Sequence, residues 1–134
     1  MTETSETHTE SDHDADAASL RRRCETIVHA SSTAAAAAAS VTIIPGSASV
    51  AIMPIQVAMV AAIAKEHGLD LSASLVKSVV YASLGSIAGR AGAGLLLRFV
   101  PVAGNLVRAS VAFSVTEALG HLVLERLEKG EGLA

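Results

Sequence analysis

The sequence of 134 residues contains no tryptophan, one tyrosine and two phenylalanines, although 51% of its residues are hydrophobic. Alanine, valine, leucine and glycine supply most of that apolar content. Helices built from such residues can approach one another closely, but large aromatic anchors are missing. The lack of an aromatic stacking platform, together with the small number of basic residues, excludes a typical nucleic-acid-binding protein. We therefore expect no nucleic-acid partner.

Cysteine is nearly absent as well, because Cys24 is the only one. An intramolecular disulfide is impossible, and nothing favours an oxidising compartment. We expect a buried thiol. The chain opens with acidic, Ser/Thr-rich residues rather than a basic and then apolar signal segment. These features predict a location on the cytoplasmic side, either in the cytoplasm or peripheral or integral at the inner membrane.

Motifs that carry chemistry are missing too. The sequence has no phosphate-binding loop of the Walker type, since the glycine-rich residues 85–94 contain no Lys-Ser/Thr ending and follow no strand. His67 and His121 have no Cys or carboxylate at metal-ligand spacing in the sequence, and no nucleophile elbow is present. We predict that the chain is not an enzyme and has no cofactor and no metal site.

Charge divides the chain into unlike parts. The net charge is −3, yet the first 16 residues hold six acidic residues and no Lys or Arg, so residues 17–134 carry a net charge of +3. Residues 1–16 have no Leu, Ile, Val or aromatic residue, which predicts a disordered acidic tail. His8, Asp12 and His13 fit no strong metal motif within it. We expect one helical domain over 17–130 and a short tail over 131–134.

No charged residue occurs between Thr26 and Ala64, a stretch of 39 residues. A single membrane-crossing helix needs only about 20 residues, and the Pro45-Gly46 pair interrupts this stretch. Two apolar arms, 30–44 and 50–64, therefore form a helical hairpin. Its alternatives are burial in a protein core or oligomer, or entry into one leaflet of a bilayer.

Hydrophobic periodicity predicts an all-α domain of about four helices arranged as two antiparallel hairpins. The first helix begins at Asp16 and buries a stripe that includes Leu20, Cys24 and Val28. The second begins at Pro54 and ends at Gly68, and it is apolar nearly all round, so it should be central. The third runs over 73–100 with Ser72 as its cap, and the fourth over 106–129. The turn residues are Pro45, Gly46, Pro54, Gly68, Pro101 and Gly104.

Glycines are concentrated within the predicted third helix. Each interior glycine weakens a helix by about 1 kcal/mol relative to alanine, so a packing gain is expected in return. Gly85 and Gly89 lie four residues apart, which is typical of close helix–helix contacts. The alternative is a break or kink in the helix over 91–94.

Isolated polar residues in apolar surroundings are candidates for buried contacts. Arg90 and Glu117 would face each other if helices 73–100 and 106–129 pair around a turn near residue 103, so we predict an ion pair between them. Gln56 is the one neutral polar side chain of the second helix. It would bond a neighbouring backbone carbonyl or fix the helix register.

Arginines at predicted helix ends have two interpretations. Arg21, Arg22 and Arg23 form either a solvated basic turn beside the acidic tail or a contact with lipid phosphates or an acidic partner. Arg98 and Arg108 would meet beside the second hairpin turn. They form either a solvated end or a site for a lipid phosphate or an acidic surface.

Four sequence blocks carry a resemblance: Ile44-Pro45-Gly46, residues 54–68, residues 99–105 and residues 116–120. In this order they resemble the YcjF-like domain family over residues 27–125. The resemblance implies an all-helical domain, often associated with membranes and placed after or encoded beside an Era-like or dynamin-like GTPase. The present sequence contains no GTPase domain, so at most a separate GTPase would be its partner.

Three functions follow from these observations. The first is a noncatalytic helical module that self-associates and docks on the cytoplasmic membrane face, with a separate GTPase as a further partner. The second is a soluble homo-oligomeric scaffold, which would bury the uncharged surface between identical subunits. The third is a carrier of an apolar ligand or lipid.

Overall fold

A computed structural model describes residues 2–41, 47–91 and 105–131, with side chains over 10–41, 51–89 and 108–131. Every regular element in these residues is a helix, which confirms the all-α prediction. The helices are α1 (Thr2–Ser40), α2 (Ser47–Glu66), α3 (Ala73–Ala91) and α5 (Asn105–Glu128). None of these helices combines the length and hydrophobicity that crossing a membrane requires.

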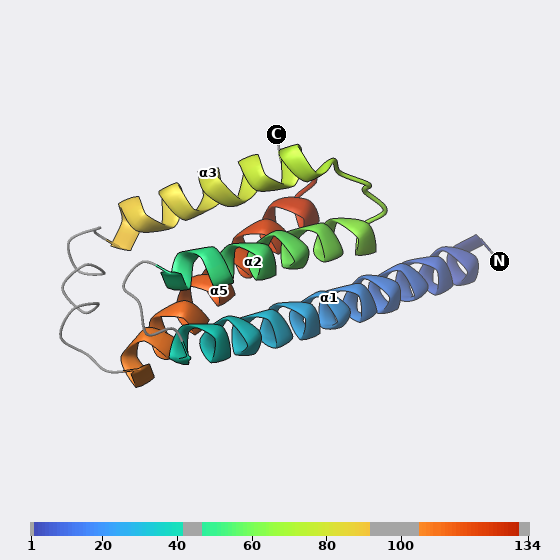
Figure 1. The fold of residues 1–134 in the computed structure, drawn as a ribbon. Helices are drawn as coiled ribbons and strands as arrows, with labels where there is room; N and C mark the ends of the chain where they lie inside the picture. Colours follow the sequence, from blue (N-terminus) through green and yellow to red (C-terminus); the bar gives the residue numbers. More distant parts are fainter. Residues whose placement is uncertain (1, 42–46, 92–104, 132–134) are drawn as a thin grey trace.

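The described helices form three layers, with α2 and α5 between α1 and α3 (Figure 1). Helix α1 packs against both central helices, most extensively against α5, and α3 packs against the other side of the same two. Consecutive helices run in opposite directions, so the predicted pairings of α1 with α2 and of α3 with α5 are both present. The central place of α2 agrees with its apolar character on nearly all sides.

The core lies where α1, α2, α3 and α5 meet. Its largest fully buried side chains are aliphatic and come from all four helices: Met59, Ile63, Leu119, Leu124, Val28, Val60, Val76, Val80 and Val123. The predicted stripe of the first helix is confirmed, because Cys24 and Val28 are buried and Leu20 packs against the same cluster. A second, smaller cluster of Ala35, Ala39 and Ala112 lies towards the other end of the bundle.

The connection between α2 and α3 follows the sequence closely. Gly68 has φ of +78°, and the N–H groups of Gly68 and Leu69 bond to the carbonyls of Lys65 (3.0 Å) and Ala64 (2.9 Å). This is the Schellman arrangement, in which glycine tolerates the left-handed conformation that closes a helix. Ser72 Oγ accepts the Leu75 N–H at 3.3 Å and so caps α3. Both predicted boundaries are confirmed.

The predicted start of the first helix is wrong. Helix α1 begins at Thr2 rather than Asp16, so residues 2–16 are helical and not disordered. The prediction rested on the lack of buried apolar surface, and the side chains of residues 10–18 are indeed all exposed. Neither proline nor glycine interrupts the chain before Pro45, and acidic residues near a helix N-terminus interact favourably with the helix dipole.

The predicted start of the second helix is also wrong, since Pro54 lies inside α2, seven residues after Ser47. Proline removes the hydrogen bond to the carbonyl of Val50, but the helix continues through it. Ile52 and Ile55, on either side of Pro54, pack against the same alanine cluster. This shared packing explains why the helix extends before the proline.

Helix α3 is described as far as Ala91. The predicted end at residue 100 and the alternative of a break over 91–94 fall on residues 92–100, which lie outside the described residues, so both stay predictions. The predicted turn residues Pro45, Gly46, Pro101 and Gly104 and the predicted site residue Arg98 lie outside the described residues. Helix α5 begins and ends within one residue of the fourth predicted helix.

Candidate interaction surface

Two of the three consecutive arginines are bound to carboxylates of the same chain. Arg21 pairs with Glu25 (3.1 Å) on its own helix and with Glu128 (2.9 Å) on α5. The hydrogen bond to Glu25 and the charge of Glu128 raise the pKa of Arg21 above its ordinary value. Arg23 pairs with Glu66 of α2 at 2.9 Å. The anions expected beside Arg21 and Arg23 are therefore internal.

Arg22, between them, is exposed to solvent. The expectation that these arginines stand near the start of a helix is wrong, because α1 begins at Thr2 and places them in its middle. They therefore do not meet the positive end of the helix dipole. Among the described residues Arg22 has no ion pair with a carboxylate.

The predicted buried thiol is confirmed, because Cys24 has no exposed surface. Its Sγ lies 3.9 Å from His67 Nδ1, which is also 3.0 Å from the carbonyl oxygen of Ile63. Burial, and then the charge of Glu66, raise the pKa of the Cys24 thiol. The fold thus keeps this sulfur protonated and covered.

Cys24 should react slowly with a thiol reagent in the native protein. Because the thiolate is the reactive species and the sulfur is buried, we expect modification by Ellman's reagent to be at least about 100-fold slower than in denaturant. The measurement is the rate of colour release with and without urea. Equal rates would contradict the burial of Cys24 between α1 and α2.

Gln56 is buried, as predicted, but its partner is a side chain. Its Nε2 donates a hydrogen bond to Thr116 Oγ1 at 3.2 Å, across the contact between α2 and α5. Both side chains are buried. Of the two predicted roles, this contact agrees with fixing the helix register, because the partner lies on the neighbouring helix.

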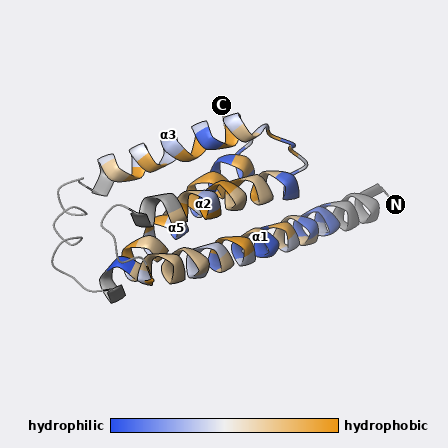
Figure 2. Cartoon of the chain, viewed as in Figure 1, coloured by the Kyte–Doolittle hydropathy of each residue, from blue (hydrophilic) through white to orange (hydrophobic). Residues whose placement is uncertain are grey.

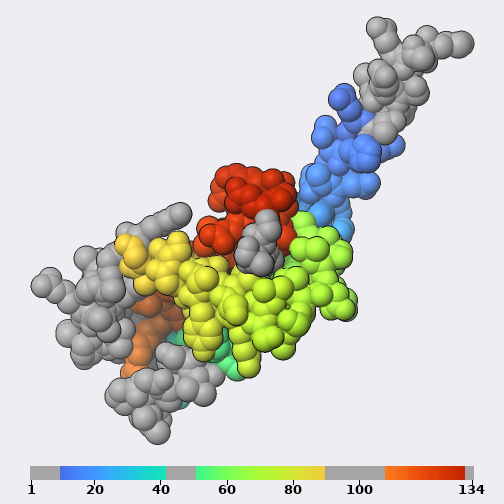
Figure 3. All heavy atoms as spheres, turned by 90° about the horizontal axis from the view of Figure 1, so that it is seen from above, coloured from blue at the N-terminus to red at the C-terminus, as the bar shows by residue number. Residues whose placement is uncertain are grey.

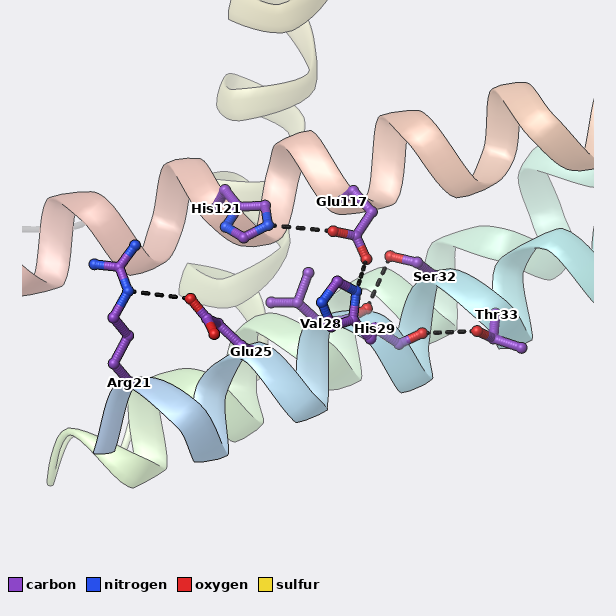
Figure 4. A network of polar contacts seen from close by, with 8 residues as sticks. All are labelled: Arg21, Glu25, Val28, His29, Ser32, Thr33, Glu117 and His121. Carbon is purple, nitrogen blue, oxygen red and sulfur yellow. Dashed lines mark hydrogen bonds and ion pairs between the residues drawn. The ribbon is translucent and has the colours of Figure 1, made fainter. Parts of the chain in front are cut away.

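Glu117 receives contacts from two histidines (Figure 4). Its Oε1 lies 2.6 Å from His29 Nδ1 of α1, and its Oε2 lies 3.2 Å from His121 Nε2 of α5. The Glu117 side chain is 17% exposed, against 62% for His29 and 47% for His121. No three ligating side chains in the described residues are placed to hold a metal ion. The cluster joins α1 to α5 at the surface.

The predicted pair of Arg90 and Glu117 stays a prediction, because the Arg90 side chain lies outside the described residues. A double-mutant cycle between His29 and Glu117, with alanine at each site, should give a coupling of about 0.5 kcal/mol, since solvent screens the pair. A double-mutant cycle between Arg90 and Glu117 should give a coupling energy above about 1 kcal/mol if that pair forms. Urea unfolding measures both coupling energies. If the losses of stability from the Arg90 and Glu117 substitutions are additive, the predicted ion pair is wrong.

The glycines that pack closely are not those expected. A Cβ atom at Gly85 or Gly89 would meet nothing within 4 Å, and both residues are exposed on α3. The predicted close approach at these two positions is therefore wrong within the described chain. At Gly120 of α5, by contrast, a Cβ would lie 2.5 Å from Val28 Cγ2 of α1. The tight contact between helices is here.

The outer surface of α1 and α2 is unusual in composition. None of the exposed described side chains between Thr26 and Ala64 is Asp, Glu, Lys or Arg, because the sequence has none of these residues there. These exposed residues are Thr26, His29, Ala30, Thr33, Ala34, Ala37, Val41, Ala51, Pro54 and Ala58. Val41, 77% exposed, is the most exposed large hydrophobic residue described. Figure 2 shows how polar residues give way to apolar ones along α1.

Residues 2–18 of α1, here called the projecting segment, extend beyond the other helices (Figure 1), and Figure 3 shows the coloured part of this segment, from residue 10 on, projecting from the body of the molecule. The side chains described within it, residues 10–18, are all exposed. Glu10, Asp12, Asp14 and Asp16 give it negative charge without a basic residue. Over residues 10–18 the exposed side chains therefore give this helix no support from burial in its own bundle.

Arg108, predicted to lie beside Arg98, is half-buried on α5. Arg98 lies outside the described residues, so the expected contact between these two side chains stays a prediction.

The chain matches no protein-family model, and comparisons with curated proteins and with solved structures found no significant match. The YcjF-like resemblance thus stays an expectation from the sequence blocks alone.

Proposed function

We propose that this chain is a noncatalytic helical module that self-associates. One observation carries the proposal: the exposed described surface between Thr26 and Ala64 contains no Asp, Glu, Lys or Arg side chain. Soluble monomers normally cover such area with a mixture of charged residues, and a large uncharged patch is typical of a contact surface. Five of the ten exposed residues described in this stretch are alanine, and such small side chains permit close packing with another helix.

A second candidate is docking on an anionic membrane surface. Val41 follows α1 directly and is 77% exposed, and residues 71–116 contain four basic and no acidic residues. An exposed apolar side chain and an excess of basic residues are both typical of proteins that dock on an anionic bilayer. A partnership with a separate GTPase rests only on the sequence resemblance, and neither experiment below depends on it.

The intact chain should elute in detergent-free buffer with a mass that is a multiple of 13.6 kDa. The measurement is size-exclusion chromatography with light scattering. Flotation with phosphatidylglycerol vesicles tests the membrane candidate, with phosphatidylcholine vesicles as the control. A monomer that floats with the anionic vesicles would favour the membrane over self-association. A monomer that ignores both would overturn both proposals.

A further inference from the structure

The projecting segment needs a partner that its own bundle does not provide. Helices in proteins owe most of their stability to tertiary packing rather than to intrinsic propensity, and serine, threonine and aspartate are weak helix formers. The described side chains of the segment are exposed. Its acidic residues have no basic residue within the segment to pair with. A partner should therefore bring a helix surface and positive charge.

The second half of the same helix presents that combination. Beyond residue 18, the outward face of α1 carries exposed Arg22 and then the small uncharged residues Thr26, Ala30, Thr33 and Ala37. The opposite face is buried, since Cys24, Val28, Ala35 and Ala39 pack into the bundle. This outward face from Arg22 to Ala37 is about 23 Å long, and the projecting segment is about 25 Å long. The two halves of α1 match in length.

We infer that two copies of this chain pair through α1 in antiparallel fashion, with the projecting segment of each copy lying along the outward face of α1 in the other. This inference rests on the proposed self-association and names its surface. A two-fold axis near Ser19 makes the contact isologous. Asp16 then faces Arg22 of the second copy, and Asp12 faces its Thr26. The small residues of both halves permit close approach of the helices.

Charge selects this orientation over a parallel one. In a parallel pair each of Asp12, Asp14 and Asp16 would lie beside its own counterpart, and like charges at that distance repel. The antiparallel pair separates the two acidic segments and brings each towards an arginine. Arg21 and Arg23 are already bound to Glu128 and Glu66, so exposed Arg22 is the cation that the contact uses. Electrostatic complementarity of this kind sets orientation and partner choice.

Charge reversal tests the contact on the intact chain. Arg22→Glu in one variant, and Asp12→Lys with Asp16→Lys in another, should each raise the dimer dissociation constant at least about tenfold, because each homodimer then brings like charges together. Mixing the two variants should restore the dimer, since every facing pair is again of opposite charge. Lys77→Glu, an equal charge change at an exposed site of α3, should leave the constant unchanged. Sedimentation velocity measures all four samples.

Cysteine crosslinking fixes the direction of the helices. Ser19→Cys should give a disulfide-linked dimer under mild oxidation, because the two-fold axis brings residue 19 next to itself. Thr26→Cys should not, since it faces residue 12 of the second copy. Efficient crosslinking at residue 26 would show a parallel pair and overturn the inference. The wild-type chain, with only buried Cys24, is the control.

The outcomes separate this inference from the proposed function. If the wild type is oligomeric but charge reversal and mixing have no effect, the antiparallel α1 contact is wrong and self-association uses another surface. If the wild type is monomeric at every concentration, both fail. Circular dichroism of each variant should match the wild type, because all substituted side chains except Ser19 are exposed.

Discussion

Replacing Gly120 with leucine should lower the free energy of unfolding by about 2–3 kcal/mol. Even a Cβ atom at this position would lie 2.5 Å from Val28 Cγ2 and 3.1 Å from Val28 Cβ. Valine is branched at Cβ and cannot move aside by a change at the end of a long chain. Helices α1 and α5 would have to separate, although their contact is the most extensive in the bundle. Urea unfolding followed by circular dichroism measures the loss.

Gly85→Leu is the matched control, because a Cβ atom at this exposed position would meet nothing within 4 Å among the described residues. It should stabilise the protein by about 0.5–1 kcal/mol through helix propensity alone. A compensating pair adds a second check: Val28→Ala combined with Gly120→Ala should be more stable than the two single effects predict, by about 1 kcal/mol. A destabilisation at residue 85 as large as that at residue 120 would contradict the packing described here.

Thr116→Val should destabilise the protein by about 1–3 kcal/mol, although valine and threonine have nearly the same shape. The reason is that Thr116 Oγ1 accepts the hydrogen bond of Gln56 Nε2 inside the bundle, at 3.2 Å. Without that oxygen the amide keeps its desolvation penalty and loses its partner. Gln56→Leu should cost less, since a threonine hydroxyl in a helix can bond the carbonyl four residues before it.

The double variant Gln56→Leu with Thr116→Val should recover most of the stability, because neither polar group is then left unsatisfied. The quantity to measure is the coupling energy from the double-mutant cycle, obtained from urea unfolding. All variants should share the same dependence of the free energy of unfolding on urea concentration. A double variant as unstable as the sum of the single ones would show that the two residues act independently. The hydrogen bond between α2 and α5 would then contribute nothing specific.

The elements that sequence reasoning found are those governed by local chemistry. The end of α2 at Gly68 and the cap of α3 at Ser72 depend on a positive φ and on a side-chain oxygen, and both are visible in the sequence. The buried stripe through Cys24 and Val28 follows from helical periodicity. The pairing of α1 with α2 follows from the short connection between them.

The wrong predictions concern residues whose local pattern fits more than one structure. A glycine in a helix indicates either close packing or simple tolerance, and only the tertiary structure shows that among the described residues Gly120, rather than Gly85 or Gly89, faces a neighbour. Proline is favoured in a first helical turn, yet packing of Ile52 and Ile55 on one cluster extends α2 before Pro54.

The candidate site was only partly predictable for a similar reason. Gln56 and Glu117 stand out as polar residues in apolar sequence, but their partners Thr116 and His29 come from other helices 60 and 88 residues away. The signal for the outward face of α1 was present in the uncharged stretch from Thr26 to Ala64. The exposure of this face could not be predicted from the sequence, because it depends on which side of α1 packs against α2 and α5.

Sedimentation equilibrium of the intact chain in detergent-free buffer, over a wide range of protein concentration, is the most direct test of self-association. We expect a weight-average mass that rises with concentration above the 13.6 kDa of one chain. We also expect added salt to lower this mass, because the contact between Asp16 and Arg22 is electrostatic. A mass of 13.6 kDa at every concentration would contradict the account.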